Sequence, residues 1–313
     1  MEKRRRKKRD CDSLGMGYYH FCTDGLKAGC LFYNQSQYAF GMTLIATITL
    51  LFKIKIYAFV LMPNHIHIIL SGKGEDCYQA FKYLKRRISA RLVKDGYPPL
   101  PEQYDFKLVP IDNMNQMKSN IIYVVRNPYE KGLSLPGGYP WGSGYLYYST
   151  LHSFIDGVPA DRLSARAIEQ MTGRRLKFPN TWKYHQELGI LPSSFVDISM
   201  VKRLFHGHKE YMTSIIKDYE SLVKIADSLE EGSPEFDFKE IRDIVIKVSN
   251  EMFKGKDVNT MSTEEKYRLA AHLYEKYRLS IDAIAKVTSM TPSLLKQVLR
   301  SKDYGIKGFV EPQ

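Results

Sequence analysis

The chain has 313 residues, which is enough for a sizeable core and favours two domains over one. Its 46 Lys and Arg residues outnumber 34 Asp and Glu residues, giving a formal net charge of +12. This excess favours a polyanionic partner, because neutralising phosphates releases condensed counterions, although charge alone does not separate nucleic acid from an anionic membrane. The longest apolar stretch, 39–52, is too short to span a bilayer, so we expect no membrane insertion.

The basic N-terminal segment and the four cysteines indicate where in the cell the protein is expected. Seven basic residues between Lys3 and Arg9 are followed by no apolar segment, so we do not expect a signal peptide. We expect residues 1–16 to form a basic disordered arm, either lying on DNA or solvated without a specific task. The cysteines form no C-x-x-C pair and are too sparse for a disulfide scaffold, so we expect reduced thiols in a cytoplasmic protein. They are Cys11, Cys22, Cys30 and Cys77.

Hydrophobic periodicity predicts an alternating series of elements in the first 130 residues. Strands are expected at 17–22, 55–61, 65–70 and 107–111, and helices at 35–51, 78–94 and 115–127, the last ending near Pro128. The order β-α-β-β-α-β-α predicts an α+β fold with helices on one face of an antiparallel sheet. After a Gly/Pro/Tyr-rich loop at 136–148, everything beyond about residue 155 is predicted to be helical, with a linker at 232–234.

The most informative segment is the pair of histidines that follows the Pro63-Asn64 turn. Because side chains alternate along a strand, His65 and His67 point to one face, where two imidazoles can bind one divalent cation. The alternative is a pair of half-exposed histidines satisfied by neighbours or water. A second pair, His206 and His208, flanks a glycine in a basic helical region and is interpreted as surface.

The sequence VLMPNHIHIIL, residues 60–70, resembles the signature of the single-tyrosine HUH transposases, especially the REP-associated tyrosine transposase branch. The sequence NIIYVVRNPYEKGL, residues 120–133, is similar to the tyrosine-helix motif of that family. The resemblance implies that Tyr123 is the nucleophile and that His65, His67 and Asn127 hold Mg²⁺ or Mn²⁺. Tyr123 and Asn127 share one helix face at i and i+4. Val125 departs from the family, which often carries histidine there.

The resemblance covers residues 18–149 and implies a ferredoxin-like catalytic domain at 17–150. It also gives the basic helix 78–94 a task, since its cations can follow a DNA backbone while Tyr83 stacks on a base. A solvated amphipathic helix is the alternative. The predicted DNA contacts of this domain are Lys82, Lys85, Arg86, Arg87, Arg91 and Arg126.

The last part of the chain, 256–313, has the pattern of a helix-turn-helix. A long helix at 263–277 is followed by a short one capped by Ser280, and Thr291 with Pro292 begins the last helix. That helix is expected to bury Leu295, Val298 and Leu299. Its polar face suits contacts with duplex DNA. The predicted contacts are Lys296, Gln297 and Arg300.

The resemblance therefore implies a metal-dependent transposase that cleaves and rejoins single-stranded or hairpin DNA through a 5′-phosphotyrosine. Two alternatives stay open: a DNA-binding regulator with an inactive HUH domain, and a domesticated nuclease acting on repeated palindromic elements. The predicted helical region 151–255 carries no chemical signature, and both a monomer and a homodimer fit the sequence.

Overall fold

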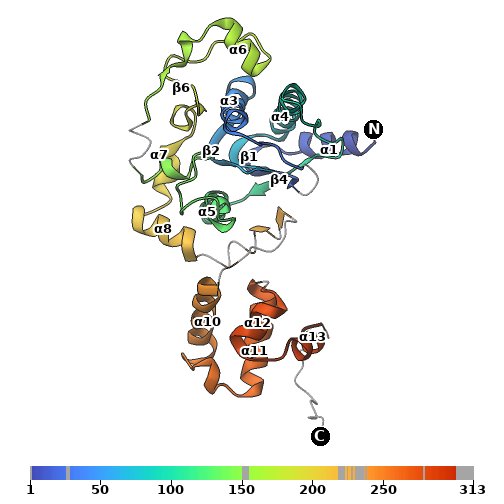
Figure 1. The fold of residues 1–313 in the computed structure, drawn as a ribbon, viewed down its shortest axis with the longest axis vertical. Helices are drawn as coiled ribbons and strands as arrows, with labels where there is room; N and C mark the ends of the chain where they lie inside the picture. Colours follow the sequence, from blue (N-terminus) through green and yellow to red (C-terminus); the bar gives the residue numbers. More distant parts are fainter. Residues whose placement is uncertain are drawn as a thin grey trace. The chain divides into compact units, whose positions relative to one another are not determined.

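The protein is described by a computed structural model. It describes residues 2–25, 29–149, 155–217, 238–277 and 279–300, together with residues 223, 225, 226, 228, 229 and 236. The chain divides into two compact units, Met1–Asp218 and Tyr219–Gln313 (Figure 1). Among the described helices, none combines the length and the apolar character needed to cross a membrane.

The first unit is built on a four-stranded antiparallel sheet with the strand order β2-β3-β1-β4. Its strands are β1 (Met16–Thr23), β2 (Lys55–Leu61), β3 (Ile66–Lys73) and β4 (Phe106–Ile111). Across this sheet Cys22 of β1 lies opposite His67 of β3 and Lys107 of β4. With helices after β1 and β3, the chain follows the β-α-β-β-α-β order of a ferredoxin-like domain, which confirms the predicted α+β class.

Helices cover both faces of this sheet. The helices are α3 (Gln35–Leu51), α4 (Gly74–Lys94) and α5 (Met114–Glu130). Phe21 of β1 packs against Phe81 of α4, whereas the neighbouring His20, which points to the opposite face, contacts Tyr123 of α5. The expectation of helices on one face is therefore wrong for α5 (Figure 1). The physical reason is that residues 66–70 of β3 are all buried, so both faces need cover.

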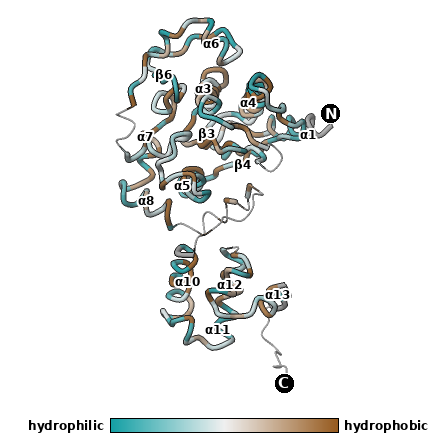
Figure 2. The backbone as a smooth tube through the Cα atoms, in the orientation of Figure 1, coloured by the Kyte–Doolittle hydropathy of each residue, from teal (hydrophilic) through white to brown (hydrophobic). Residues whose placement is uncertain are grey.

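Helix α3 lies deep in the first unit. Asn34 caps it by accepting a hydrogen bond from the Gln37 amide, and its residues from Ala39 to Ile48 are buried. Figure 2 shows that much of α3 is apolar. The buried hydroxyls of Thr43 and Thr47 donate to backbone carbonyls one turn earlier, which satisfies them inside the core.

The region after residue 155 is only partly helical, contrary to the prediction. Residues 155–217, the described part of this region in the first unit, contain a small antiparallel sheet, three helices and two short 3-10 turns. These elements are β5 (Val158–Pro159), η3 (Ala160–Arg162), α6 (Ala165–Thr172), β6 (Lys183–His185), β7 (Gly189–Ile190), η4 (Pro192–Ser194), α7 (Ile198–Arg203) and α8 (His208–Lys217). A further 3-10 turn, η1 (Gly144–Leu146), precedes them. Val201 and Tyr211 belong to the same hydrophobic core as the four-stranded sheet, so the first unit extends beyond the predicted boundary at residue 150.

The basic N-terminal segment is a helix, α1 (Glu2–Asp12), and the expectation of a disordered arm is wrong. Its C-terminal end packs closely on α4, where a Cβ added to Gly74 would lie 2.1 Å from the Cys11 carbonyl oxygen. Cys11 is buried, and the Lys7 ammonium donates to the Phe106 carbonyl. The contacts with α4 and β4 thus order a segment whose charge alone favours disorder.

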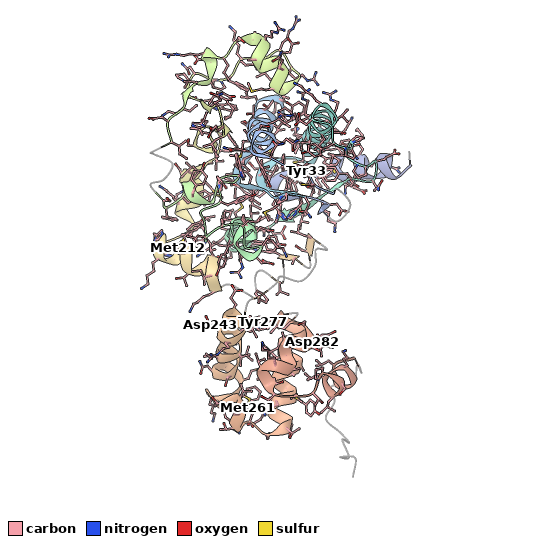
Figure 3. The ribbon with its side chains drawn as sticks, viewed as in Figure 1. Tyr33, Met212, Asp243, Met261, Tyr277 and Asp282 are labelled. Carbon is pink, nitrogen blue, oxygen red and sulfur yellow. The ribbon has the colours of Figure 1, made fainter. Side chains whose placement is uncertain are left out.

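The second unit is a helical bundle around Leu269, Leu273 and Tyr277, the last labelled in Figure 3. Its elements are α10 (Phe238–Phe253), η5 (Val258–Thr260), α11 (Thr263–Tyr277), α12 (Ile281–Thr288) and α13 (Pro292–Arg300). The Ser280 hydroxyl accepts from the Ala283 amide and caps α12, as predicted. Because α10 shares this core, the unit begins before the expected residue 256. The Val298 side chain lies outside the described residues.

Candidate active site

Three aromatic rings gather on the α5 face of the sheet. The centroid of the Tyr123 ring lies 5.6 Å from that of His67 and 5.9 Å from that of His20, both in edge-on geometry. His67 and His20 have no exposed surface, and Tyr123 is 6% exposed. The predicted tyrosine and one predicted histidine are therefore in direct contact, although they come from a helix and a strand far apart in the sequence.

The two predicted metal ligands are neighbours. His65 ends the turn before β3 and His67 lies within that strand, with ring centroids 4.8 Å apart at an interplanar angle of 89°. The turn is held in place by its surroundings, since the Pro63 carbonyl accepts from the Leu31 amide and the Met62 amide donates to the His65 carbonyl. His65 is half-buried, whereas His67 is enclosed.

A third histidine, His20 of β1, was missed by the sequence analysis. Its Nδ1 lies 2.7 Å from Asn120 Oδ1, and its Nε2 lies 3.0 Å from His67 Nδ1. The strand carries a signal that identifies it, because alternation places His20 on the face opposite the apolar Tyr19 and Phe21. A polar side chain at that position of a buried strand needs a polar partner on the helix above.

The ring nitrogens of both predicted ligands fit a metal site. His65 Nδ1 lies 2.7 Å from Asn64 Oδ1, and His67 Nδ1 is bonded to His20, so coordination through Nε2 is compatible with both contacts. Within the described residues, no three or more His, Cys, Asp or Glu side chains form a group able to hold a metal. Two imidazoles would therefore be completed by other oxygen or nitrogen ligands, which divalent cations such as Mg²⁺ and Mn²⁺ accept.

Asn127, the predicted third ligand, lies one turn after Tyr123 on α5. It is 8% exposed, and its amide donates to the Tyr123 backbone carbonyl at 3.4 Å. Its role in holding a metal stays a prediction. The helix does not end at Asn127 as expected but continues through Pro128 to Glu130. Pro128 costs the helix one backbone hydrogen bond, and the packing of α5 against the sheet and α8 offsets that loss.

The predicted DNA contacts on α4 separate into two groups. Lys82 and Arg86 are exposed and line a surface groove that also contains Lys7, Tyr78 and Tyr104. The other three cations are engaged by the protein itself. Lys85 donates to the carbonyls of Glu102 and Tyr104, Arg87 to those of Gln170 and Met171, and Arg91 to the Asp95 carboxylate.

Two predicted contacts are wrong because the side chains are enclosed. Tyr83 is 4% exposed and its hydroxyl donates to the Thr172 carbonyl, so its ring is not available to a base. Arg126 has no exposed surface, and its guanidinium donates to the Ile215 carbonyl at 2.6 Å. The sequence of α5 does not predict that a later helix, α8, covers Arg126.

Helix α4, which lines the groove, and helix α5, which carries Tyr123, lie on opposite faces of the sheet (Figure 1). Phe81 and Tyr104, which line the groove, pack together on the Phe21 side. The exposed Lys82 and Arg86 are thus separated from the candidate nucleophile by the sheet.

Of the predicted contacts in the second unit, Lys296 is exposed on α13 and Leu295 is buried beneath it. The side chains of Gln297 and Arg300 lie outside the described residues. In the first unit, His206 and His208 are exposed, which confirms that they are surface residues. Hydrogen bonds from Lys118 and His206 lower the pKa of Glu210 to about 2.

No family model matches the sequence, and no curated protein matches it. A solved structure of a REP-associated tyrosine transposase bound to a REP hairpin is similar over 43% of this chain and 81% of that chain, with 17% sequence identity and a TM-score of 0.34. A similarity of this size does not establish a shared function, so the functional case depends on the motifs and the site geometry.

Proposed function

We propose that this protein is a metal-dependent DNA endonuclease and strand transferase, a transposase that uses Tyr123 as its nucleophile. The observation that carries the proposal is the contact between the Tyr123 ring and the His67 ring, 5.6 Å apart, beside His65. A tyrosine packed on one of two neighbouring histidines would bring a nucleophile and two nitrogen ligands to one phosphate. The motifs that carry these residues are the two that resemble the HUH family.

In the proposed reaction the Tyr123 oxygen attacks the scissile phosphorus in line with the bond to the 3′-oxygen. The phenol releases its proton to solvent, the P–O3′ bond breaks, the tyrosine becomes linked to the 5′-phosphate, and the leaving 3′-oxygen takes up a proton from solvent to become a hydroxyl. A bound Mg²⁺ or Mn²⁺ would polarise the phosphate and offset its charge. His65, His67 and Asn127 would hold that ion and thereby orient the phosphate toward the phenol. Rejoining reverses the same steps and conserves the phosphodiester, so it needs no ATP.

The proposed substrate is single-stranded or hairpin DNA. The exposed Lys82 and Arg86, with Lys7 beside them, lie on the opposite face of the sheet from Tyr123 and would bind the DNA backbone away from the cleaved phosphate. Lys296 of the second unit would add contacts to a duplex. A DNA-binding regulator with an inactive catalytic domain is the second candidate, and it is favoured by the exposed Ser293 and Lys296 of α13. A nuclease that acts on repeated palindromes would share the chemistry and differ in its substrate.

The proposal is tested by incubating the full chain with end-labelled hairpin DNA from the flanks of its own gene, with Mg²⁺ or Mn²⁺, followed by denaturing electrophoresis. We expect a covalent protein–DNA adduct that requires metal and is absent from Tyr123→Phe. Tyr129→Phe, a second tyrosine of α5, is the matched control and should retain the adduct. An adduct that survives in Tyr123→Phe would show that another residue is the nucleophile. No adduct with tight duplex binding would favour the regulator.

A further inference from the structure

A chain of buried polar side chains connects α5, β1 and β3 beneath the candidate site. The Asn120 amide nitrogen donates to the Gln116 carbonyl at 2.8 Å, and Asn120 Oδ1 lies 2.7 Å from His20 Nδ1. His20 Nε2 then lies 3.0 Å from His67 Nδ1. Asn120 is 5% exposed and both histidines have no exposed surface, so water does not compete for these contacts.

The contacts dictate where the protons are. Because the Asn120 nitrogen donates to a backbone carbonyl, Oδ1 is the atom that faces His20, and an amide oxygen only accepts. His20 must therefore carry its proton on Nδ1. In a neutral imidazole the other nitrogen accepts, so His20 Nε2 accepts a hydrogen bond from His67 Nδ1. His67 is then protonated on Nδ1 and has its lone pair on Nε2.

We infer that Asn120 and His20 form a positioning relay that fixes His67 in the tautomer with an unprotonated Nε2. This inference rests on the proposed function, in which His67 Nε2 is a metal ligand. A ligating histidine needs its other nitrogen held by an acceptor, which sets both the tautomer and the ring orientation. His20 supplies that acceptor, and both of its own nitrogens are engaged, so it is a positioning residue and not a ligand.

The relay also relates the nucleophile to the metal ligand. Asn120 lies three residues before Tyr123 on α5, so both side chains point to the same region of the sheet. The hydrogen bond between Asn120 and His20 fixes the position of α5 relative to β1. The hydrogen bond between His20 and His67 in turn connects β1 to β3. A shift of α5 would therefore disturb the tyrosine and the histidine together.

The first test needs neither metal nor DNA. In the metal-free, ¹⁵N-histidine-labelled full chain at pH 8, long-range ¹H–¹⁵N correlation spectra report which ring nitrogens are protonated. We expect His67 and His20 both to be protonated on Nδ1 and unprotonated on Nε2. A His67 protonated on Nε2, alone or on both nitrogens, would overturn the inference.

A pair of substitutions isolates the acceptor. In His20→Gln the side-chain oxygen can reach the former Nε2 position and accept from His67, whereas the shorter His20→Asn cannot. We expect His20→Asn to shift His67 toward the other tautomer and to weaken Mn²⁺ binding, measured by calorimetry, by about 10- to 100-fold. His20→Gln should keep the tautomer and most of the affinity. Equal losses in both variants would refute the relay, provided that thermal melts show both to be folded.

The outcomes separate this inference from the proposed function. If His67 has the predicted tautomer but the protein binds no Mn²⁺ and forms no adduct, the relay is supported and the metal-dependent activity is contradicted. Conversely, an adduct that forms equally well in wild type and His20→Asn, with unchanged His67 protonation, would retain the activity and remove the relay.

Discussion

The guanidinium of Arg126 donates to the Ile215 carbonyl, 2.6 Å away, and to the Ile216 carbonyl at 3.3 Å. These carbonyls belong to the last turn of α8, whose backbone acceptors lack partners within the helix. A cation at this end also interacts favourably with the helix dipole. Arg126 thereby attaches α8 to the helix that carries Tyr123.

We expect Arg126→Met to lower the free energy of unfolding by about 3 kcal/mol, because it leaves two buried carbonyls and the nearby Glu130 without their cation. Urea denaturation measures this loss, and the exposed Arg166→Met is the control. Near its own unfolding midpoint the variant would bind DNA poorly, but its folded fraction should bind with unchanged affinity. A lower affinity of fully folded protein would indicate a direct contact.

The two metal-ligand candidates should differ in stability when metal is absent. His67 is enclosed and bonded to His20, so His67→Ala is expected to cost about 1–3 kcal/mol in the free energy of unfolding. The half-buried His65→Ala should change it by less than about 0.5 kcal/mol. Denaturation in EDTA measures both. Both variants are expected to lose the covalent adduct, and equal stabilities would contradict the burial of His67.

Exposed cations on α4 should contribute to DNA affinity through counterion release. For single-stranded DNA, Lys82→Ala with Arg86→Ala is expected to reduce the slope of log affinity against log salt by roughly 1.4, since each phosphate contact contributes about 0.7. Fluorescence anisotropy across a salt series provides the measurement. Arg174→Ala with Lys177→Ala removes two exposed charges elsewhere on the first unit. A slope lost equally in that control would show that net charge matters and the groove does not.

Stability should fall as the pH rises above 9. Burial raises the pKa of Cys77 to about 12 and that of Cys11 to about 11, from an ordinary value of 9.0. In the unfolded chain these thiols release their protons near pH 9, while the native protein retains them. The free energy of unfolding therefore decreases between pH 9 and 12, and these thiols do not change it at lower pH. Urea midpoints at pH 8, 9 and 10 measure the effect. Cys11→Ala with Cys77→Ala should flatten the decline between pH 9 and 10.

The strands and the three helices around the sheet follow from periodicity, because burial on one face imposes a regular spacing on the sequence. Periodicity does not predict which side of the sheet α5 occupies, since an amphipathic helix can pack on either face. Likewise, α1 is ordered by contacts with α4 and β4 that no local pattern contains. Arg126 has the composition of a surface residue and is enclosed by a helix more than 80 residues later.

For the site, the resemblance of two motifs to the HUH family predicted that His67 lies close to both His65 and Tyr123. It did not predict His20, because the partners of His20 lie 47 and 100 residues away and only the strand register brings them together. The sequence nevertheless contains a usable sign in β1, where one polar side chain alternates with buried aromatic ones. Searching each predicted strand for such a residue would add positioning residues to motif-based assignments.

The tyrosine and both histidines come from one compact unit of one chain, with α5 held between the sheet and α8. A single copy thus contains the whole constellation, and exchange of α5 between two copies would require α8 to separate from it. Complementation between inactive copies should therefore fail. Mixing Tyr123→Phe with His67→Ala, or producing the two together, is expected to yield no adduct, whereas a site shared between subunits would regain activity in a fraction of the mixed dimers.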